Sequence, residues 1–114
     1  MTVVIYHNPN CPSSVNAVRI AEELGVEFET VLYLKTPPDR ERLAWLVAHL
    51  EDAPADLVRK DSRFAKLGLR AEDYETPEAV VDLLAREKAL LQRPVVVRGE
   101  RAIIGRPKER VREL

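Results

Sequence analysis

The first 34 residues combine a strand, a helix and a second strand, and this order constrains the fold more than any other feature of the sequence. Val3–Tyr6 (VVIY) and Phe28–Leu34 (FETVLYL) are rich in β-branched and aromatic residues, which is typical of strands. The stretch between them has apolar residues at helical spacing followed by a glycine suited to a helix C-cap, namely Ala17, Ile20, Ala21, Leu24 and Gly25. Such a unit predicts two parallel strands joined by a helix.

Near the C-terminus the sequence predicts a β-hairpin. Pro94–Arg98 and Arg101–Ile104 are β-rich runs separated by Gly99-Glu100, which suits a two-residue turn. This turn sets the strand register as the pairs Val95–Ile104, Val97–Ala102 and Arg98–Arg101. A short helix over Pro107–Leu114 is expected to follow.

The segment between these two halves is predicted to be helical. Thr36-Pro37-Pro38-Asp39 has the features of a helix start, with Thr36 as the N-cap. Residues 54–69 are expected to form short helices, and Thr76-Pro77-Glu78 is expected to start another helix. Because no strand pattern occurs over residues 36–88, we interpret this segment as a helical insertion between two halves of one sheet.

Composition excludes several classes of protein. The chain has 114 residues, 46% of them hydrophobic and 32% charged, which suits one soluble domain. A net charge of -1 does not favour a general nucleic-acid surface. The first ten residues do not resemble a signal peptide, no apolar run is long enough to span a membrane, and no His, Cys and carboxylate spacing indicates a metal site. We therefore expect a cytoplasmic protein without membrane, nucleic-acid or metal binding.

Cys11 is the only cysteine, and it lies between the first predicted strand and the first predicted helix. Pro12 suits the first helical position, which makes Cys11 the expected N-cap. The sulfur then faces the N–H groups of Ser13 and Ser14 at the positive end of the helix dipole, and both effects favour the thiolate. His7 would act in the same direction if it were protonated and near; the alternative is a hydrogen-bonding role within the loop.

A lone cysteine is often a small buried hydrophobe, but the neighbours of Cys11 are polar and turn-forming, which favours thiol chemistry. Ser14 occupies the position where a C-x-x-C motif would have its second cysteine. An oxidised form of Cys11 must therefore be reduced by a thiol from outside the chain. No internal disulfide is possible with one cysteine, so nothing indicates an oxidising compartment.

The hairpin singles out two arginines. Continuing its register pairs Arg93 with Arg106 at the end away from the turn, and each is followed by a proline, Pro94 or Pro107. Two like charges opposite each other are unfavourable unless an anion lies between them, and guanidinium groups bind tetrahedral oxyanions with paired hydrogen bonds. The alternative is a splayed surface pair. From its own surroundings, Arg59 is expected to be an ordinary cation on a helix surface.

Several short motifs occur in an order that resembles the glutaredoxin-coupled arsenate reductase family over nearly the full chain. They are His7-Asn8-Pro9-Asn10-Cys11, Leu32-Tyr33-Leu34 with Pro37-Pro38, Leu57-Val58-Arg59-Lys60, Leu67-Gly68-Leu69, Gln92-Arg93-Pro94-Val95-Val96-Val97 and Gly105-Arg106-Pro107. The resemblance implies an α/β, thioredoxin-like fold with a β-α-β half, a β-hairpin-α half and an all-helical insertion. Residues 1–114 would form a single domain, with a core of residues 1–35 and 89–114 and an insertion over about residues 36–88.

The resemblance also implies a mechanism. Cys11 would be the nucleophile, Arg59, Arg93 and Arg106 would hold arsenate, and Pro94 would be the cis-proline of thioredoxin-like folds. The thiolate attacks arsenic, glutathione adds to the adduct, and glutaredoxin removes the glutathione as a mixed disulfide so that arsenite leaves. Glutathione is then a co-substrate, and no bound cofactor is expected.

The chain differs from the family pattern at two positions close to the cysteine. Pro12 replaces a glycine that often follows the cysteine, and Val15 replaces an arginine often found four residues after it. Two other functions remain open. One is an Spx-like regulator or adaptor that binds RNA polymerase, although such proteins typically carry the C-x-x-C pair that Ser14 removes. The other is a glutathione-dependent thiol oxidoreductase of the same fold that acts on another substrate.

Overall fold

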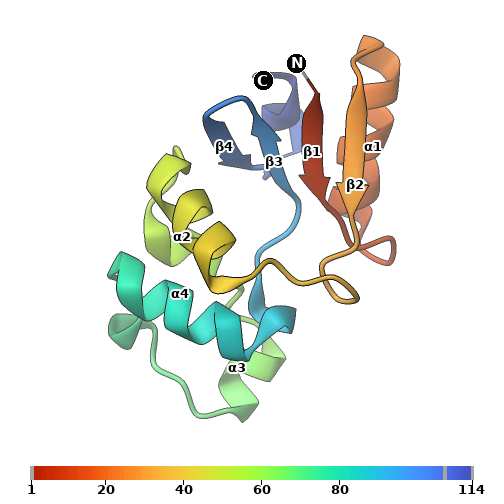
Figure 1. Ribbon diagram of the computed structural model, residues 1–114. Helices are drawn as coiled ribbons and strands as arrows, with labels where there is room; N and C mark the ends of the chain where they lie inside the picture. The colour runs from red at the N-terminus through yellow and green to blue at the C-terminus, as the bar shows by residue number, and fades with distance from the viewer. Residues whose placement is uncertain (1, 107, 114) are drawn as a thin grey trace.

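The computed structural model describes residues 2–106 and 108–113. The described residues form a mixed α/β fold, with a strand–helix–strand unit first, a row of helices next and a β-hairpin near the C-terminus (Figure 1). The elements are β1 (Val3–Tyr6), α1 (Pro12–Leu24), β2 (Phe28–Val31), α2 (Arg40–His49), η1 (Pro54–Leu57), α3 (Ser62–Lys66), η2 (Ala71–Asp73), α4 (Pro77–Arg86), η3 (Lys88–Leu90), β3 (Val95–Arg98), β4 (Arg101–Ile104) and η4 (Lys108–Glu113).

The strands form one sheet in the order β2-β1-β3-β4. Strand β1 runs parallel to β2, as the strand–helix–strand unit predicts, and β3 runs antiparallel to both β1 and β4. The hairpin has the predicted register, with Val95 opposite Ile104 and Arg98 opposite Arg101. Its turn contains Gly99 at φ 62°, a left-handed conformation that glycine adopts without strain.

The second strand is shorter than the sequence predicts. It ends at Val31 rather than Leu34, where the carbonyl of Val31 accepts the N–H of His7 at 2.8 Å. The chain then turns, since the amides of Lys35 and Thr36 both donate to the carbonyl of Leu32 at 2.9 Å. This turn follows from the short length of β1, which ends at residue 6 and offers no further strand to pair with.

One predicted helix start is wrong. Helix α2 begins at Arg40, and its N-cap is Asp39, whose carboxylate accepts the N–H of Arg42 at 2.8 Å. Thr36, the expected N-cap, is instead part of the turn after β2. Helix α4 starts as predicted, with the Thr76 hydroxyl accepting the N–H of Ala79 at 3.2 Å.

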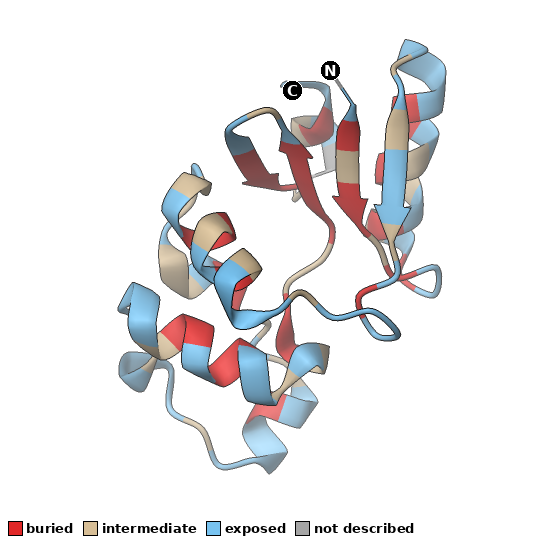
Figure 2. Ribbon diagram, viewed as in Figure 1, coloured by how far each residue is buried: buried red, intermediate tan, exposed pale blue. Residues whose placement is uncertain are grey.

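Both faces of the sheet are covered. On one face, Val3, Ile5 and Val96 pack against α1 and η4. On the other face, Val95 and Val97 pack against a larger core that includes α2 and α4. Strand β3 is therefore buried on both sides, whereas β2, at the edge, has no buried residue (Figure 2). Period-two alternation along β3 thus distributes its valines between two cores.

The helices between β2 and β3 lie together beside the sheet (Figure 1). Residues 36–88 are all described, and they form no strand. Two isolated bridges, Leu50–Ala102 and Val58–Leu91, tie this segment to the C-terminal part of the chain. Among the residues that the structure describes, no helix is both long and apolar enough to cross a membrane.

Candidate active site

Cys11 is the N-cap of α1, as predicted, and Pro12 occupies the start of the helix. The loop and the first helical turn both fix its backbone. The amide of Cys11 donates to the carbonyl of Asn8, while the amides of Ser14 and Val15 donate to the carbonyl of Cys11, all at 3.0 Å. The residue is only 5% exposed, so its sulfur lies beneath the surface rather than on it.

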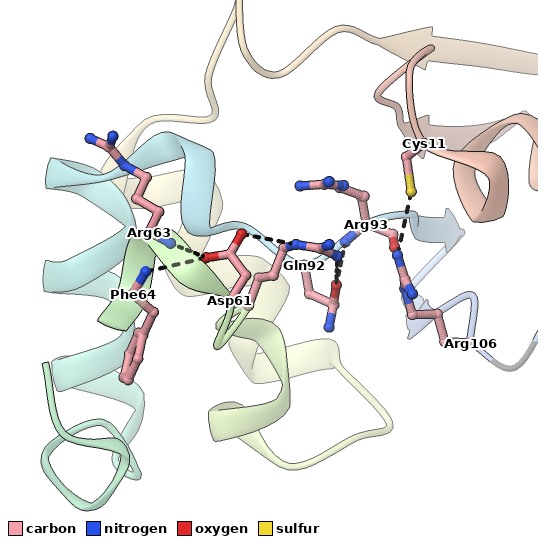
Figure 3. A network of polar contacts seen from close by, with 8 residues as sticks. Cys11, Asp61, Arg63, Phe64, Gln92, Arg93 and Arg106 are labelled. Atoms are coloured by element: carbon pink, nitrogen blue, oxygen red, sulfur yellow. Dashed lines mark hydrogen bonds and ion pairs between the residues drawn. The ribbon is translucent and has the colours of Figure 1, made fainter. Parts of the chain in front are cut away.

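Cys11 is buried in polar surroundings, because an arginine from near the C-terminus contacts its sulfur. Arg106 donates from Nη2 to Sγ of Cys11 at 3.4 Å and from Nε to the carbonyl of Arg93 at 2.8 Å (Figure 3). The Arg93-Pro94 bond is cis, as the resemblance implies. The hairpin pairing continues past the strands, with the amide of Gly105 donating to the carbonyl of Pro94 at 2.8 Å. The expected juxtaposition of Arg93 and Arg106 is therefore present.

The surroundings of Cys11 favour its ionised form. Burial raises the pKa of the thiol, but the Arg93 guanidinium and the Ser14 and Ser13 amides outweigh that effect, so the pKa lies below its ordinary value. The sulfur makes no capping hydrogen bond with the first turn of α1, and the two amides act on it as nearby dipoles. Arg93 and Arg106 thus place two cations beside one sulfur.

Arg59 is linked to Arg93 through the side chain of Gln92. Its Nε donates to Oδ2 of Asp61 at 3.1 Å, and its Nη1 donates to Oε1 of Gln92 at 3.4 Å. The same Gln92 oxygen accepts the backbone N–H of Arg93 at 3.2 Å. Arg59 is outside any helix and its side chain is 27% exposed, so it is not the ordinary helix-surface cation that its sequence surroundings indicate. Figure 3 shows the resulting series of contacts from Asp61 to Cys11.

His7 and Ser14 contact each other at the start of α1. The His7 Nδ1 and Ser14 Oγ atoms are 2.6 Å apart, and Ser14 Oγ also accepts the amide of Asn8 at 2.9 Å. Burial lowers the pKa of His7, so the neutral imidazole is favoured at neutral pH. A positively charged His7 acting on Cys11 is therefore not supported. Ser14, which is completely buried, instead joins the loop before Cys11 to the helix after it.

Tyr33 belongs to one of the family motifs, but the sequence indicates no role for its side chain, which lies beside Arg93. Tyr33 is completely buried, and neither its hydroxyl nor Nε of Arg93 has a hydrogen-bond partner among the described residues. The two side chains interact electrostatically: burial lowers the pKa of Arg93, but Cys11 and Tyr33 raise it overall. An aromatic residue in an apolar run looks like an ordinary core residue, so the local sequence does not indicate that Tyr33 contacts the site. Buried unpaired groups of this kind commonly bind a water or a ligand.

Chemically, the site combines a thiol of lowered pKa with cationic side chains. A thiolate can attack an electrophilic centre, and guanidinium groups can hold the oxygens around that centre. The described residues contain no group of three or more side chains arranged to hold a metal ion. The fold and this site together define a thioredoxin-like protein with one cysteine of lowered pKa beside arginine side chains.

Comparison with known proteins identifies the family. The model of the ArsC family matches residues 6–114, so the chain belongs to the ArsC family. It is 39% identical to the uncharacterized protein YfgD of Escherichia coli strain K12, covering 98% of this chain and 95% of that protein. It is 35% identical to an arsenate reductase of Escherichia coli, covering 98% of this chain and 79% of that protein.

The fold comparison agrees with the sequence comparison. The solved structure described as an arsenate reductase from Vibrio cholerae matches with a TM-score of 0.87 and 32% identity, covering 99% of this chain and 97% of that one. The predicted family resemblance and the thioredoxin-like α/β fold are therefore confirmed. The roles of the individual residues stay predictions.

Proposed function

We propose that this protein reduces arsenate to arsenite with Cys11 as its nucleophile and with glutathione and glutaredoxin as reductants. The observation that carries the proposal is the contact between Arg106 and the sulfur of Cys11, within a network that also holds Arg59 and Arg93. Family relatives that are named arsenate reductases support the choice of substrate.

In the proposed reaction, the arginines hold arsenate, a tetrahedral oxyanion, by charge-assisted hydrogen bonds. The Cys11 thiolate attacks arsenic(V), an As–S bond forms, and one protonated oxygen leaves as water. Glutathione then displaces a second oxygen as water through its own thiol. The thiolate of glutaredoxin attacks the glutathione sulfur, the As–S(glutathione) bond breaks, and its electron pair reduces arsenic(V) to arsenic(III). Hydrolysis of the remaining As–S bond releases arsenite and restores Cys11.

The chain's own residues account for two requirements of this scheme. Arg93 and Arg106 stabilise the thiolate before attack and the negative oxygens during it. Ser14, where a C-x-x-C motif would have its second cysteine, cannot resolve a mixed disulfide, so the reducing thiols must come from outside the chain. Glutathione and glutaredoxin are reductants of a reducing compartment, so a cytoplasmic location is part of the proposal.

One observation favours a second candidate. Val15 is 47% exposed in the first turns of α1, where family members often have an arginine. The loss of this cation weakens the case for arsenate as the substrate. The second candidate is then a glutathione-dependent thiol oxidoreductase that acts on a glutathione conjugate, such as a glutathione mixed disulfide. An Spx-like regulator would instead bind RNA polymerase and reduce neither substrate.

The deciding experiment supplies the purified protein with arsenate, glutathione and glutaredoxin and measures arsenite. The proposal predicts arsenite formation that stops when glutaredoxin is omitted and that is absent from the Cys11→Ser variant. The same preparations are assayed with a glutathione mixed disulfide. Reduction of that disulfide without arsenite formation would replace the first candidate with the second, and activity in neither assay would reject both.

A further inference from the structure

One side chain in the arginine network is uncharged. Gln92 is the only glutamine in the chain, and it directly precedes Arg93. The backbone N–H of Gln92 donates to the carbonyl of Leu57 at 2.8 Å, and the backbone N–H of Arg59 donates to the carbonyl of Leu90 at 2.7 Å. These backbone contacts hold the segment that carries Arg59 against the segment that carries Arg93.

The side chain of Gln92 then links the two arginines directly. Its Oε1 accepts the backbone N–H of Arg93 at 3.2 Å and the Nη1 of Arg59 at 3.4 Å, so both lone pairs of the amide oxygen have a donor (Figure 3). Nε of the same Arg59 guanidinium donates to Oδ2 of Asp61 at 3.1 Å. Two acceptors therefore fix the guanidinium, one charged and one neutral.

The neutrality of Gln92 matters for anion binding. Asp61 already offsets part of the positive charge of Arg59. A second carboxylate in the place of Gln92 would orient Arg59 equally well, but it would also offset more of the charge that attracts an oxyanion. The amide oxygen of Gln92 can orient a guanidinium without adding negative charge.

We propose that Gln92 is a positioning residue for oxyanion binding, which holds the Arg59 guanidinium so that Arg59 and Arg93 face the same tetrahedral oxyanion. This inference rests on the oxyanion site of the proposed function, but it does not depend on the reduction step. Gln92 acts through Arg59 and does not itself touch the anion.

The test measures how well inorganic phosphate protects Cys11 from iodoacetamide at a fixed pH, with each variant compared with its own rate without phosphate. Gln92→Met keeps the approximate size but removes the acceptor, and Gln92→Glu keeps an acceptor but adds a charge. We expect the half-protecting phosphate concentration to rise about five- to tenfold in Gln92→Met and at least as much in Gln92→Glu. Asn16→Ala removes another amide that accepts from an arginine, Arg19, and should match the wild type.

A purely structural role makes a different prediction. If Gln92 only joins two segments, Gln92→Met lowers the temperature of unfolding, but phosphate protects this variant as it protects the wild type; that result would overturn the inference. Unchanged protection of Gln92→Glu would overturn it as well, because a carboxylate beside Arg59 must weaken an anion site that Arg59 helps to form. Thermal unfolding of each variant, measured in parallel, separates lost anion binding from lost folding.

Phosphate is not reduced, so this result is independent of catalysis. If phosphate protects the wild type but the protein makes no arsenite, the proposed reductase function fails and the Gln92 variants still decide the inference. If phosphate does not protect the wild type, the oxyanion site itself is rejected, and the role of Gln92 with it.

Discussion

Arg106 donates a hydrogen bond to the sulfur of Cys11 at 3.4 Å, although the two residues lie 95 positions apart in the chain. Cys11 is fixed by the start of α1, and Arg106 follows the last strand of the sheet. The antiparallel pairing of β3 with β4 and of β3 with β1 brings these two positions to the same end of the sheet. The topology thus places a guanidinium beside the sulfur of Cys11 without any local sequence motif that contains both residues.

Arg106→Ala should raise the arsenate concentration needed for half-maximal arsenite formation about 10- to 100-fold, because one bidentate charged contact contributes about 1.5–3 kcal/mol. Arg106→Lys keeps the charge but loses the planar, two-pronged geometry of the guanidinium. Its half-saturating arsenate concentration should therefore lie between those of the wild type and Arg106→Ala. Arg112→Ala is the matched control, since Arg112 forms an exposed ion pair with Glu23. An unchanged half-saturating concentration in Arg106→Ala would remove Arg106 from the binding site.

Gly105→Ala should disturb the site through packing. A Cβ at Gly105 would lie 2.8 Å from Cγ of Pro94 and 3.0 Å from a methyl group of Val111, so the packing beside Arg93 and Arg106 must change. We expect a loss of about 1–3 kcal/mol in the free energy of unfolding, together with a lower rate of arsenite formation. Denaturant unfolding and the reductase assay measure the two effects.

Gly25→Ala provides the control for this prediction. Gly25 caps α1 at φ 67°, far from Arg106 along the chain, and a Cβ added there would meet nothing within 4 Å. Alanine at position 25 should lower the free energy of unfolding by about 1–2 kcal/mol, because it must adopt the left-handed conformation. Activity per folded molecule should therefore fall in Gly105→Ala and not in Gly25→Ala; equal activities would show that the contact at Gly105 matters only for stability.

His7 should make the fold sensitive to acid. Because burial lowers the pKa of His7 in the folded state, its neutral form stabilises the fold. This contribution is fully present above about pH 6.5, the pKa of an unfolded histidine, and is lost as the pH falls to the folded pKa. The difference in free energy of unfolding between the wild type and His7→Asn should therefore shrink on acidification through this range. A difference that grows as the pH falls would mean that His7 is charged in the folded protein.

The local patterns of the sequence predicted much of the fold. The Gly99-Glu100 turn set the hairpin register, and Thr76 marked the start of α4, because turns and caps depend on residues that are adjacent in the chain. The start of α2 was predicted wrongly because Thr36 and Asp39 are both good N-caps, and the turn onto Leu32 occupies Thr36.

The candidate site was predictable only in part. Cys11 has a local signal, since a proline follows it and polar residues flank it. Gln92 and Tyr33 belong to motifs of the family resemblance, but their local sequence gives neither of them a role, because their importance comes from contacts made across the fold. Gln92 accepts from Arg59, which is 33 residues away in the chain. Such contacts depend on how the segment before cis-Pro94 packs against the segment that carries Arg59, and no residue pattern within either segment encodes that packing.

We infer that the cations around Cys11 hold it as a thiolate, and the pH dependence of its alkylation tests this inference most directly. The rate of reaction with iodoacetamide should rise with pH to a midpoint below about 8.5, the pKa of a free cysteine. The midpoint should move upward in Arg93→Leu, because Arg93 is the largest of the groups that lower the pKa of Cys11. A midpoint at or above about 8.5 in the wild type, or the same midpoint in both proteins, would contradict the account.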